Sequence, residues 1–246
     1  NIPRDMWTKV VDIEIPEPIE FEHSSGGGKS VSDAAKLLSE AKNPVILNGA
    51  GVVLSKDGIS ASMKLAERLD APVCVGYQHN DAFPGNHPLF AGPLGYNGSK
   101  AAMQLIKEAD VVLCLGTRLN PFSTLPGYGL EYWPSEAKII QVDINPDRIG
   151  LTKKVSIGIV GDAGKVATDI FLQLSETAGD INRETRKVNI AETKSKWAQQ
   201  LSSMDHEDDD PGTTPIRNKL HLDAKKQIVH RMLFWKKQRF QIARYL

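Results

Sequence analysis

The sequence of 246 residues is long enough to bury one sizeable core and to carry additional segments, and its hydrophobic content of 41% excludes a fully disordered chain. Its 30 Lys and Arg side chains are matched by 30 Asp and Glu side chains, so no net positive field is available to hold nucleic acid or an anionic membrane. No apolar run approaches the roughly 20 residues of a membrane helix, and no secretory signal opens the sequence. We therefore expect a cytoplasmic protein that binds neither a membrane nor nucleic acid.

Helical and apolar segments alternate between residues 31 and 174. The predicted helices are 32–41, capped by Ser32, then 58–69, 99–109 and 165–174, and the predicted strands are 44–48, 71–75, 110–115, 137–144 and 156–160. The strands are continuous apolar runs, which is typical of parallel strands covered on both faces. The predicted fold class is therefore α/β: a doubly wound, mostly parallel Rossmann-like sheet with helices on both faces, plus irregular termini.

Glycines follow several of these strands. Gly49 and Gly51 follow the first strand, Gly116 the third and Gly161 the fifth. Ligands of doubly wound sheets bind at the carboxyl ends of the strands, where glycine lets a phosphate approach backbone N–H groups. The same glycines could equally serve only to turn the chain tightly between strand and helix. Leu54 occupies the third glycine position of the dinucleotide fingerprint, which disfavours an NAD-dependent oxidoreductase.

Three polar residues at strand ends are further candidates for ligand contact. Arg118 could meet a phosphate or form a surface salt bridge. Asp143 ends a predicted strand shortly before Asn145, so it could accept a hydrogen bond from a ribose hydroxyl, although capping of the next turn is the favoured interpretation. His79 and His87 lie in the long connection 76–98 without a readable nucleophile–base pair, and are interpreted as surface polarity.

The two cysteines, Cys74 and Cys114, lie within apolar runs that predict buried strands. We interpret them as inert core thiols of a reduced compartment, while a disulfide between them stays open because their separation is not known from sequence. They have no partner cysteines at the spacing of a zinc site.

The two charge types are segregated along the chain. Residues 216–246 contain nine basic side chains and one acidic, a net charge of +8, and residues 1–215 carry a net charge of −8. The acidic run at 205–210 stands just before the change of sign. A metal site is conceivable there, but a solvated acidic connector is favoured because like charges repel one another.

Five blocks, in this order, resemble the central domain of thiamine-diphosphate-dependent enzymes, the family that includes acetolactate synthase. They are 42–51 (KNPVILNGAG), 82–98 (AFPGNHPLFAGPLGYNG), 109–118 (ADVVLCLGTR), 141–150 (QVDINPDRIG) and 160–162 (VGD). Within the family, the segments 76–81, 95–100 and 117–122 are most similar to the sulfoacetaldehyde acetyltransferases, which convert sulfoacetaldehyde and phosphate into acetyl phosphate and sulfite.

The resemblance implies a division of the chain into parts. Residues 31–175 would be the central domain, 1–20 the remnant end of a preceding pyrimidine-binding domain, 21–30 a linker, 176–215 a connector with the acidic run, and 216–246 a basic tail. The resemblance stops at about residue 214, so we interpret the tail as the product of a truncation or frame shift. A genuine basic tail, or a basic amphipathic helix that binds a membrane or nucleic acid, are the alternatives.

The resemblance also implies cofactors and partners. The full-length enzymes use thiamine diphosphate and Mg²⁺, bound by domains outside this sequence, so we predict no catalytic and no metal-ligating residue here. We expect a small-molecule substrate and a homo-oligomer for the full-length enzyme, and a fragment that is inactive alone. In some relatives the central domain holds FAD or the ADP part of coenzyme A, and the matching positions, interpreted here as a vestigial nucleotide site, are Gly49, Gly51, Gly95, Asn97, Gly98, Arg118, Asp143 and Asn145. A stand-alone nucleotide-binding module is the alternative function.

Overall fold

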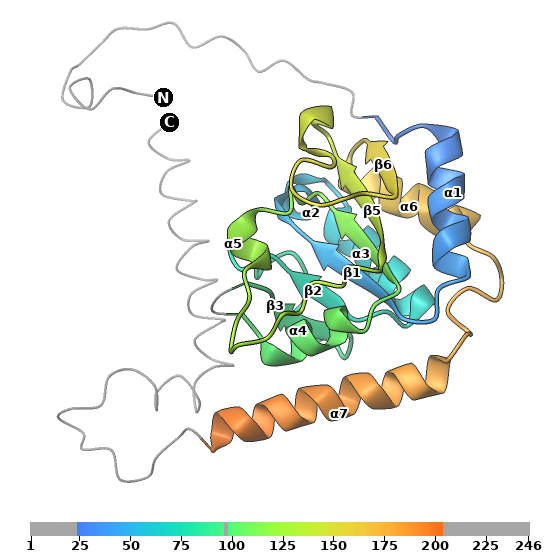
Figure 1. Cartoon of the computed structure of the whole chain (residues 1–246). Coiled ribbons are helices and arrows are strands. Elements are labelled where there is room, and N and C mark those ends of the chain that lie inside the picture. Colours follow the sequence, from blue (N-terminus) through green and yellow to red (C-terminus); the bar gives the residue numbers. More distant parts are fainter. Residues whose placement is uncertain (1–23, 96–97, 204–246) are drawn as a thin grey trace, which may run out of the picture.

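The computed structural model describes residues 24–95 and 98–203. Their six strands form one sheet in the order β3-β2-β1-β4-β5-β6, all pairs parallel, with helices on both faces (Figure 1), which confirms the predicted fold class. The strands are β1 (Pro44–Asn48), β2 (Val73–Val75), β3 (Phe90–Pro93), β4 (Val111–Leu115), β5 (Lys138–Asp143) and β6 (Ile157–Val160). The helices are α1 (Gly28–Ser39), α2 (Ala50–Leu54), α3 (Gly58–Leu69), α4 (Lys100–Lys107), α5 (Pro121–Thr124), the 3₁₀ helix η2 (Pro146–Arg148), α6 (Ala163–Gln173) and α7 (Arg183–Ser202).

The helices divide between the two faces of the sheet. Helices α1, α3 and α6 pack against one another on one face, whereas α4 covers the other face and contacts α7 (Figure 1). The apolar stripes found in the sequence explain this arrangement: α3 buries Ala61, Leu65, Ala66 and Leu69 at helical spacing. Among the described helices, none combines the length and hydrophobicity needed to span a membrane.

The predictions differ most from the structure at the start of α1 and at β3. Helix α1 begins at Gly28 with Gly27 as a cap that offers no side chain, so the prediction of Ser32 as the cap is wrong. The start of α1 also lies inside the range expected to be a linker. Strand β3 was not predicted, because its sequence Phe-Ala-Gly-Pro lacks the β-branched run that marks the other strands and lies at the edge of the sheet.

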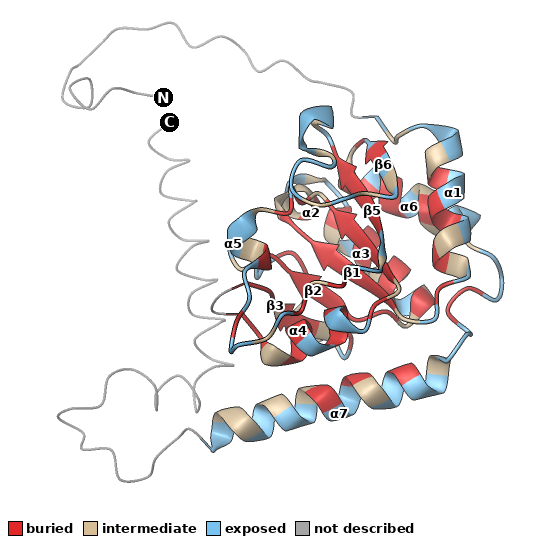
Figure 2. Ribbon diagram, in the orientation of Figure 1, coloured by how far each residue is buried: buried red, intermediate tan, exposed pale blue. Residues whose placement is uncertain are grey.

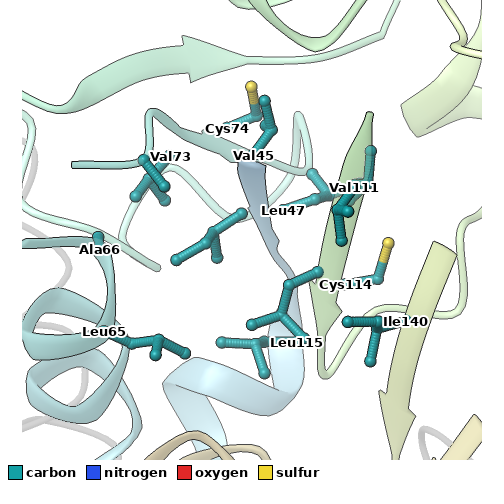
Figure 3. Packing of buried hydrophobic residues seen from close by; sticks show 14 of the residues in the cluster. Val45, Leu47, Leu65, Ala66, Val73, Cys74, Val111, Cys114, Leu115 and Ile140 are labelled. Carbon is teal, nitrogen blue, oxygen red and sulfur yellow. The ribbon is translucent and has the colours of Figure 1, made fainter. Parts of the chain in front are cut away.

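The core is centred on the two middle strands. All five residues of β1 and of β4 are buried; Figure 2 shows both strands in the colour of buried residues, and Figure 3 shows buried side chains on and around them. Leu47 on β1 lies opposite Cys74 on one side and Cys114 on the other, so the two cysteines are two strand spacings apart, about 9.5 Å. A disulfide requires Cα atoms within roughly 7 Å. Both thiols are buried and free, as predicted, and burial raises the pKa of each.

A buried polar pair ties the long connection 76–89 to the sheet. The Asn48 Nδ2 atom donates to the Ser62 hydroxyl at 2.8 Å and to the Ala82 carbonyl at 3.0 Å, and both polar side chains are fully buried. Because a buried amide without partners would be costly, this arrangement specifies where α3 and the connection meet β1.

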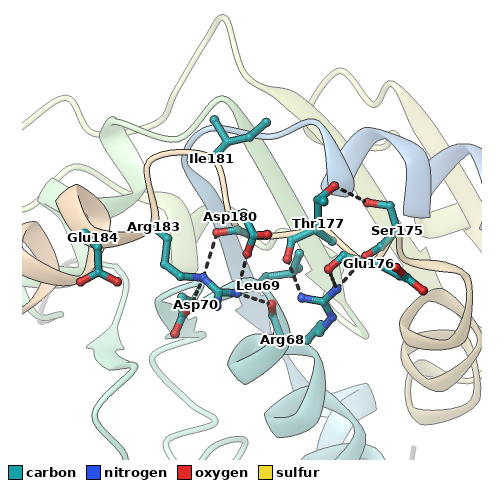
Figure 4. Close-up of polar contacts among 12 residues, drawn as sticks. Arg68, Leu69, Asp70, Ser175, Glu176, Thr177, Asp180, Ile181, Arg183 and Glu184 are labelled. Carbon is teal, nitrogen blue, oxygen red and sulfur yellow. Dashed lines mark hydrogen bonds and ion pairs between the residues drawn. The ribbon is translucent and has the colours of Figure 1, made fainter.

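The segment after α6 is fastened to the C-terminal end of α3 by arginines (Figure 4). Arg68 donates to the carbonyls of Ser175, Glu176 and Ala178. Arg183 forms an ion pair with Asp70, whose Oδ2 lies 2.9 Å from Nε. Cations placed at the C-terminal end of a helix are also favoured by the helix dipole.

Arg186 completes this fastening from the first turns of α7. Its side chain is 5% exposed, and each of its five N–H groups has a carbonyl partner between 2.6 and 3.0 Å. The acceptors are Lys42, Leu69, Asp70, Gly179 and Ile181. Burial lowers the pKa of Arg186, with the nearby Asp70 opposing that change. Residues 176–203, expected to be a connector, therefore include a helix locked onto the α/β unit.

Candidate functional site

A cavity of about 450 Å³ opens at the carboxyl ends of the strands. Strand β1 is flanked by β2 on one side and β4 on the other, so the connections that follow β1 and β4 leave in opposite directions and a crevice opens between them. The lining residues come from the connections after β1, β2, β4, β5 and β6; they are Gly49, Ala50, Gly51, Leu54, Ser55, Gly76, Gln78, His79, Gly116, Thr117, Arg118, Asn120, Ser123, Asp143, Ile144, Arg148, Gly161, Asp162 and Ala163. The cavity has the position that doubly wound sheets use for ligands.

The glycines of the cavity floor are packed backbone against backbone. The Gly49 N–H donates to the Leu115 carbonyl at 2.9 Å, and the Gly51 N–H donates to the Gly116 carbonyl at the same distance. A Cβ atom on Gly51 would lie 2.6 Å from the Gly116 Cα, and Gly116 itself has a φ of +58°. Close approach of two connections therefore requires these glycines, whether or not a phosphate also lies there.

Two arginines face the cavity from opposite connections. Arg118 follows β4 and Arg148 follows β5, and both side chains are exposed. Within the described part of the chain, neither guanidinium group makes a hydrogen bond or an ion pair. The salt bridge considered for Arg118 is thus not formed with any described residue. Arg148 was not predicted as a candidate. It lies three residues after Asn145, in the turn that follows a strand, and that position could have identified it.

Asp143 lies at the end of β5 and is 5% exposed at the cavity wall. Its Oδ1 accepts a hydrogen bond from the Asn145 N–H at 2.9 Å, which confirms the interpretation of Asp143 as a turn cap. The Asn145 Oδ1 in turn accepts from the Asp147 N–H and caps η2. Asn145 does not line the cavity. A contact of Asp143 with a ribose stays a prediction.

Gly95 and Gly98 lie beside the cavity rather than in its lining. Gly95 has a φ of +100°, and its N–H donates to the Tyr132 hydroxyl at 3.2 Å. A Cβ atom on Gly95 would meet the Phe122 carbonyl at 2.5 Å, one residue before Ser123 of the cavity wall. Gly95 therefore packs against α5, whereas a Cβ atom on Gly98 would meet the Pro93 carbonyl at 2.5 Å. Asn97, the remaining predicted position, lies outside the described residues.

Other lining residues were not singled out as ligand contacts in the sequence. Asp162 caps α6, where its Oδ1 accepts from the Gly164 and Lys165 N–H groups and from the Ser55 hydroxyl at 2.6 Å. His79, interpreted as surface polarity, lies in the cavity wall. Both follow strand ends, so the rule that selected Arg118 could have selected them too.

The lining of the cavity combines charged and uncharged polar groups. The charged side chains of the lining are two arginines, which could face an anionic ligand, and two carboxylates. Uncharged polar side chains and one histidine complete the polar lining; they are Ser55, Gln78, His79, Thr117, Asn120 and Ser123. Across residues 24–95 and 98–203, no three His, Cys, Asp or Glu side chains are grouped so that they could hold a metal ion.

Comparison with known proteins identifies the domain. Residues 31–170 match the family model of the thiamine pyrophosphate enzyme central domain. The chain belongs to the thiamine pyrophosphate enzyme family. It is 71% identical over 214 residues to a sulfoacetaldehyde acetyltransferase of Roseovarius nubinhibens, covering 87% of this chain and 35% of that protein. A probable sulfoacetaldehyde acetyltransferase of Rhizobium meliloti is 68% identical, with 87% and 36% covered.

More distant relatives and solved structures agree with this placement. A probable acetolactate synthase large subunit of Methanocaldococcus jannaschii is 37% identical over 182 residues, covering 71% of this chain and 30% of that protein. Benzoylformate decarboxylase from Polynucleobacter necessarius superposes with a TM-score of 0.55 at 22% identity, covering 73% of this chain and 33% of that one, and supports the fold alone. The chain spans about a third of the length of the curated relatives it matches.

Proposed function

We propose that this chain is the central domain of a thiamine-diphosphate-dependent enzyme that converts sulfoacetaldehyde and phosphate into acetyl phosphate and sulfite. The observation that carries the proposal is the gap in similarity: relatives named as sulfoacetaldehyde acetyltransferases are 49–71% identical to this chain, whereas those named as acetolactate synthases are 28–37% identical. We further propose that the whole enzyme is a cytoplasmic homo-oligomer that needs Mg²⁺ and that binds neither a membrane nor nucleic acid.

The described residues have a supporting role in this proposal. In this class of enzyme the bound cofactor supplies the reactive carbon, and the protein positions it. The described residues contain no group of side chains that could hold a metal ion, so they do not fit the metal–diphosphate end of that cofactor. We therefore assign the α/β unit to scaffolding and to ligand holding, and expect the chain to be inactive alone.

A chimeric enzyme tests the assignment. Residues 31–175 of this chain would replace the matching segment in the Roseovarius nubinhibens enzyme, and acetyl phosphate formation would be measured with thiamine diphosphate and Mg²⁺ present. We expect the chimera to retain activity. A matched chimera that carries the segment of the Methanocaldococcus jannaschii protein controls for the general effect of replacement. If the first chimera folds and assembles but forms no acetyl phosphate, the proposal fails.

The cavity between the connections that follow β1 and β4 favours a second candidate function, a nucleotide-binding module. The two arginines, whose guanidinium groups have no partner among the described residues, and the buried carboxylate of Asp143 are groups that could contact phosphate and ribose. The N–H groups of the lining glycines already donate to backbone carbonyls. We regard the site as vestigial, because the proposed chemistry requires no flavin.

Thermal-shift titration of the full chain with FAD, ADP and coenzyme A separates the two candidates. A ligand at about 100 times its Kd would stabilise the protein by roughly 2.7 kcal/mol, a readily measured shift. We expect no shift at micromolar ligand. A clear shift would overturn the vestigial interpretation and favour the binding module.

A further inference from the structure

A second cavity, of about 720 Å³, lies between the C-terminal part of α3, the connection 76–89 and α7. It shares no lining residue with the crevice at the carboxyl ends of the strands. Its lining combines ionisable side chains with four apolar residues, which are Pro88, Leu89, Ile190 and Ala191. A small reagent that enters it therefore meets charged groups in a partly apolar space.

Two lysines of α7, Lys187 and Lys194, line this cavity and differ in their partners. The Lys187 Nζ lies 3.4 Å from the Glu184 Oε1 and 3.9 Å from the Asp70 Oδ2. The Lys194 Nζ donates to the Pro88 carbonyl at 2.6 Å and forms no ion pair with any residue of 24–95 or 98–203. Lys194 is thus held at the cavity by a hydrogen bond but has no counter-ion in the described chain.

The two carboxylates of the cavity have other partners. The Glu67 Oε1 lies 3.2 Å from the His87 Nε2, and the Asp70 Oδ2 lies 2.9 Å from the Arg183 Nε. The titratable side chains that share the cavity with Lys194 come from the end of α3, the connection 76–89 and α7; they are Glu67, Asp70, His87 and Lys187.

Half-burial changes the acid–base state of Lys194. Burial lowers the pKa of its ammonium group, because the charged form loses water without gaining a carboxylate. A larger share of the amine is then neutral, and the neutral amine has the lone pair that attacks a carbonyl carbon. The neutral amine still carries N–H donors, so the hydrogen bond to the Pro88 carbonyl does not depend on the charge.

We propose that Lys194 is a site of chemical acetylation by acetyl phosphate, the product of the reaction proposed above. The neutral Nζ attacks the acetyl carbonyl carbon and a C–N bond forms. The bond between that carbon and the phosphate oxygen breaks, inorganic phosphate leaves with the electron pair, and the nitrogen loses one proton to water. The source of the acetyl phosphate rests on the proposed function, whereas the reactivity of Lys194 does not.

The cavity can also accommodate the modified residue. Acetyl-lysine keeps one N–H group, which can donate to the Pro88 carbonyl, and it removes a charge that has no counter-ion among the described residues. The added methyl group enters a space lined in part by Leu89 and Ile190. Modification is therefore compatible with α7 in its observed position.

The test is the rate of acetylation at each lysine when the full chain is incubated with synthetic acetyl phosphate, measured by mass spectrometry of peptides. Lys187 controls for ion pairing within the same cavity. Lys64 on α3, which is exposed and has no ion pair within the described chain, controls for accessibility. We expect Lys194 to react at least about fivefold faster than either. A rate at Lys194 that is equal to or below that of Lys64 overturns the proposal.

The pH dependence separates reactivity from mere access. Because the Lys194 amine becomes neutral at a lower pH than an exposed lysine, its rate advantage over Lys64 should shrink as the pH rises from about 8 to about 10. A difference in accessibility alone would leave the ratio of the two rates constant, and a constant ratio would overturn the proposed cause.

A matched pair of variants tests the missing counter-ion. Ala191 is exposed and lies three residues before Lys194 on α7, so Ala191→Glu places a carboxylate at the spacing of a helical ion pair. We expect Ala191→Glu to slow acetylation of Lys194 about twofold. Ala191→Gln, which has the same size without the charge, should leave the rate unchanged. Equal rates in the two variants would overturn the role of the missing counter-ion.

The outcomes also separate this site from the proposed function. If the chimera described above forms no acetyl phosphate but added acetyl phosphate modifies Lys194 preferentially, the proposed function fails and the reactive lysine stands. If the chimera is active but Lys194 reacts no faster than Lys64, the reactive lysine fails and the proposed function stands.

Discussion

The Gly51 amide nitrogen donates a hydrogen bond to the carbonyl oxygen of Gly116, 2.9 Å away, across the crevice between the turns that follow β1 and β4. The two backbones approach so closely that neither residue has room for a side chain. The floor of the cavity is consequently a packing contact as well as a candidate binding surface.

Substitution of Gly116 by alanine should therefore be costly. We expect a loss of about 3 kcal/mol in the free energy of unfolding, because a positive φ of +58° and a collision with Gly51 add together. Urea unfolding measures the loss. Gly129→Ala is the matched control, because Gly129 has a φ of +69° and nothing within 4 Å of the added Cβ, so it should lose only about 1 kcal/mol. If Gly116→Ala and Gly129→Ala lose the same free energy of unfolding, close packing against Gly51 does not contribute to the cost at Gly116.

Replacement of Arg186 by methionine should release α7. Five carbonyls would lose their donor, and we expect the free energy of unfolding to fall by about 3 kcal/mol. Hydrogen exchange should accelerate in 183–202 more than in the sheet. Lys196→Met, which removes only an exposed pair with Glu192, should change the free energy of unfolding by less than about 0.5 kcal/mol. Uniformly accelerated exchange would indicate that Arg186 supports the whole domain instead.

Tyr132 should make the protein sensitive to alkaline conditions. Burial raises the pKa of its hydroxyl to about 12, above the value of about 10 in an unfolded chain. Below pH 10 both states keep the proton and stability is unaffected; between pH 10 and 12 only the unfolded state loses it, so stability falls as pH rises. Urea midpoints measured across this interval should fall less steeply in Tyr132→Phe than in the parent. If the urea midpoints of the parent and of Tyr132→Phe fall equally with pH, Tyr132 is not the group responsible.

The two thiols should be unreactive until the protein unfolds. Burial raises the pKa of both Cys74 and Cys114, and only the thiolate reacts. A chromogenic disulfide reagent should detect no thiol in native protein and two in urea. The intervening strand also predicts that a mild oxidant forms no intramolecular disulfide in the native state, which mass measurement after alkylation would reveal.

Much of the fold was predictable because parallel strands are buried on both faces. The apolar runs that became β1, β4 and β5 are visible without any partner. Strand β3 could not be found in this way, since Gly92 and Pro93 carry no strand signal and pairing with β2 alone defines it. The start of α1 was missed because Gly27 caps through its backbone conformation rather than a side chain.

The candidate site was predictable only where it follows a strand end. Arg118 and Asp143 were selected by that rule and do line the cavity. Gly95 and Asn145 belong to neighbouring turns, and their separation from the cavity depends on how those turns fold. The Gln141 amide donates to the Thr117 and Arg148 carbonyls, and so joins the connections after β4 and β5, a contact between two connections that a local sequence pattern does not encode.

The acceptors of Arg186 come from three stretches that are remote in sequence: residue 42, residues 69–70 and residues 179–181. During synthesis, the first two stretches leave the ribosome more than a hundred residues before the arginine that joins them. Until then the carbonyls at the end of α3 must be satisfied by water. The sheet can form early, but the carbonyls that precede β1 and β2 gain their hydrogen bonds to Arg186 only once α7 has been synthesised.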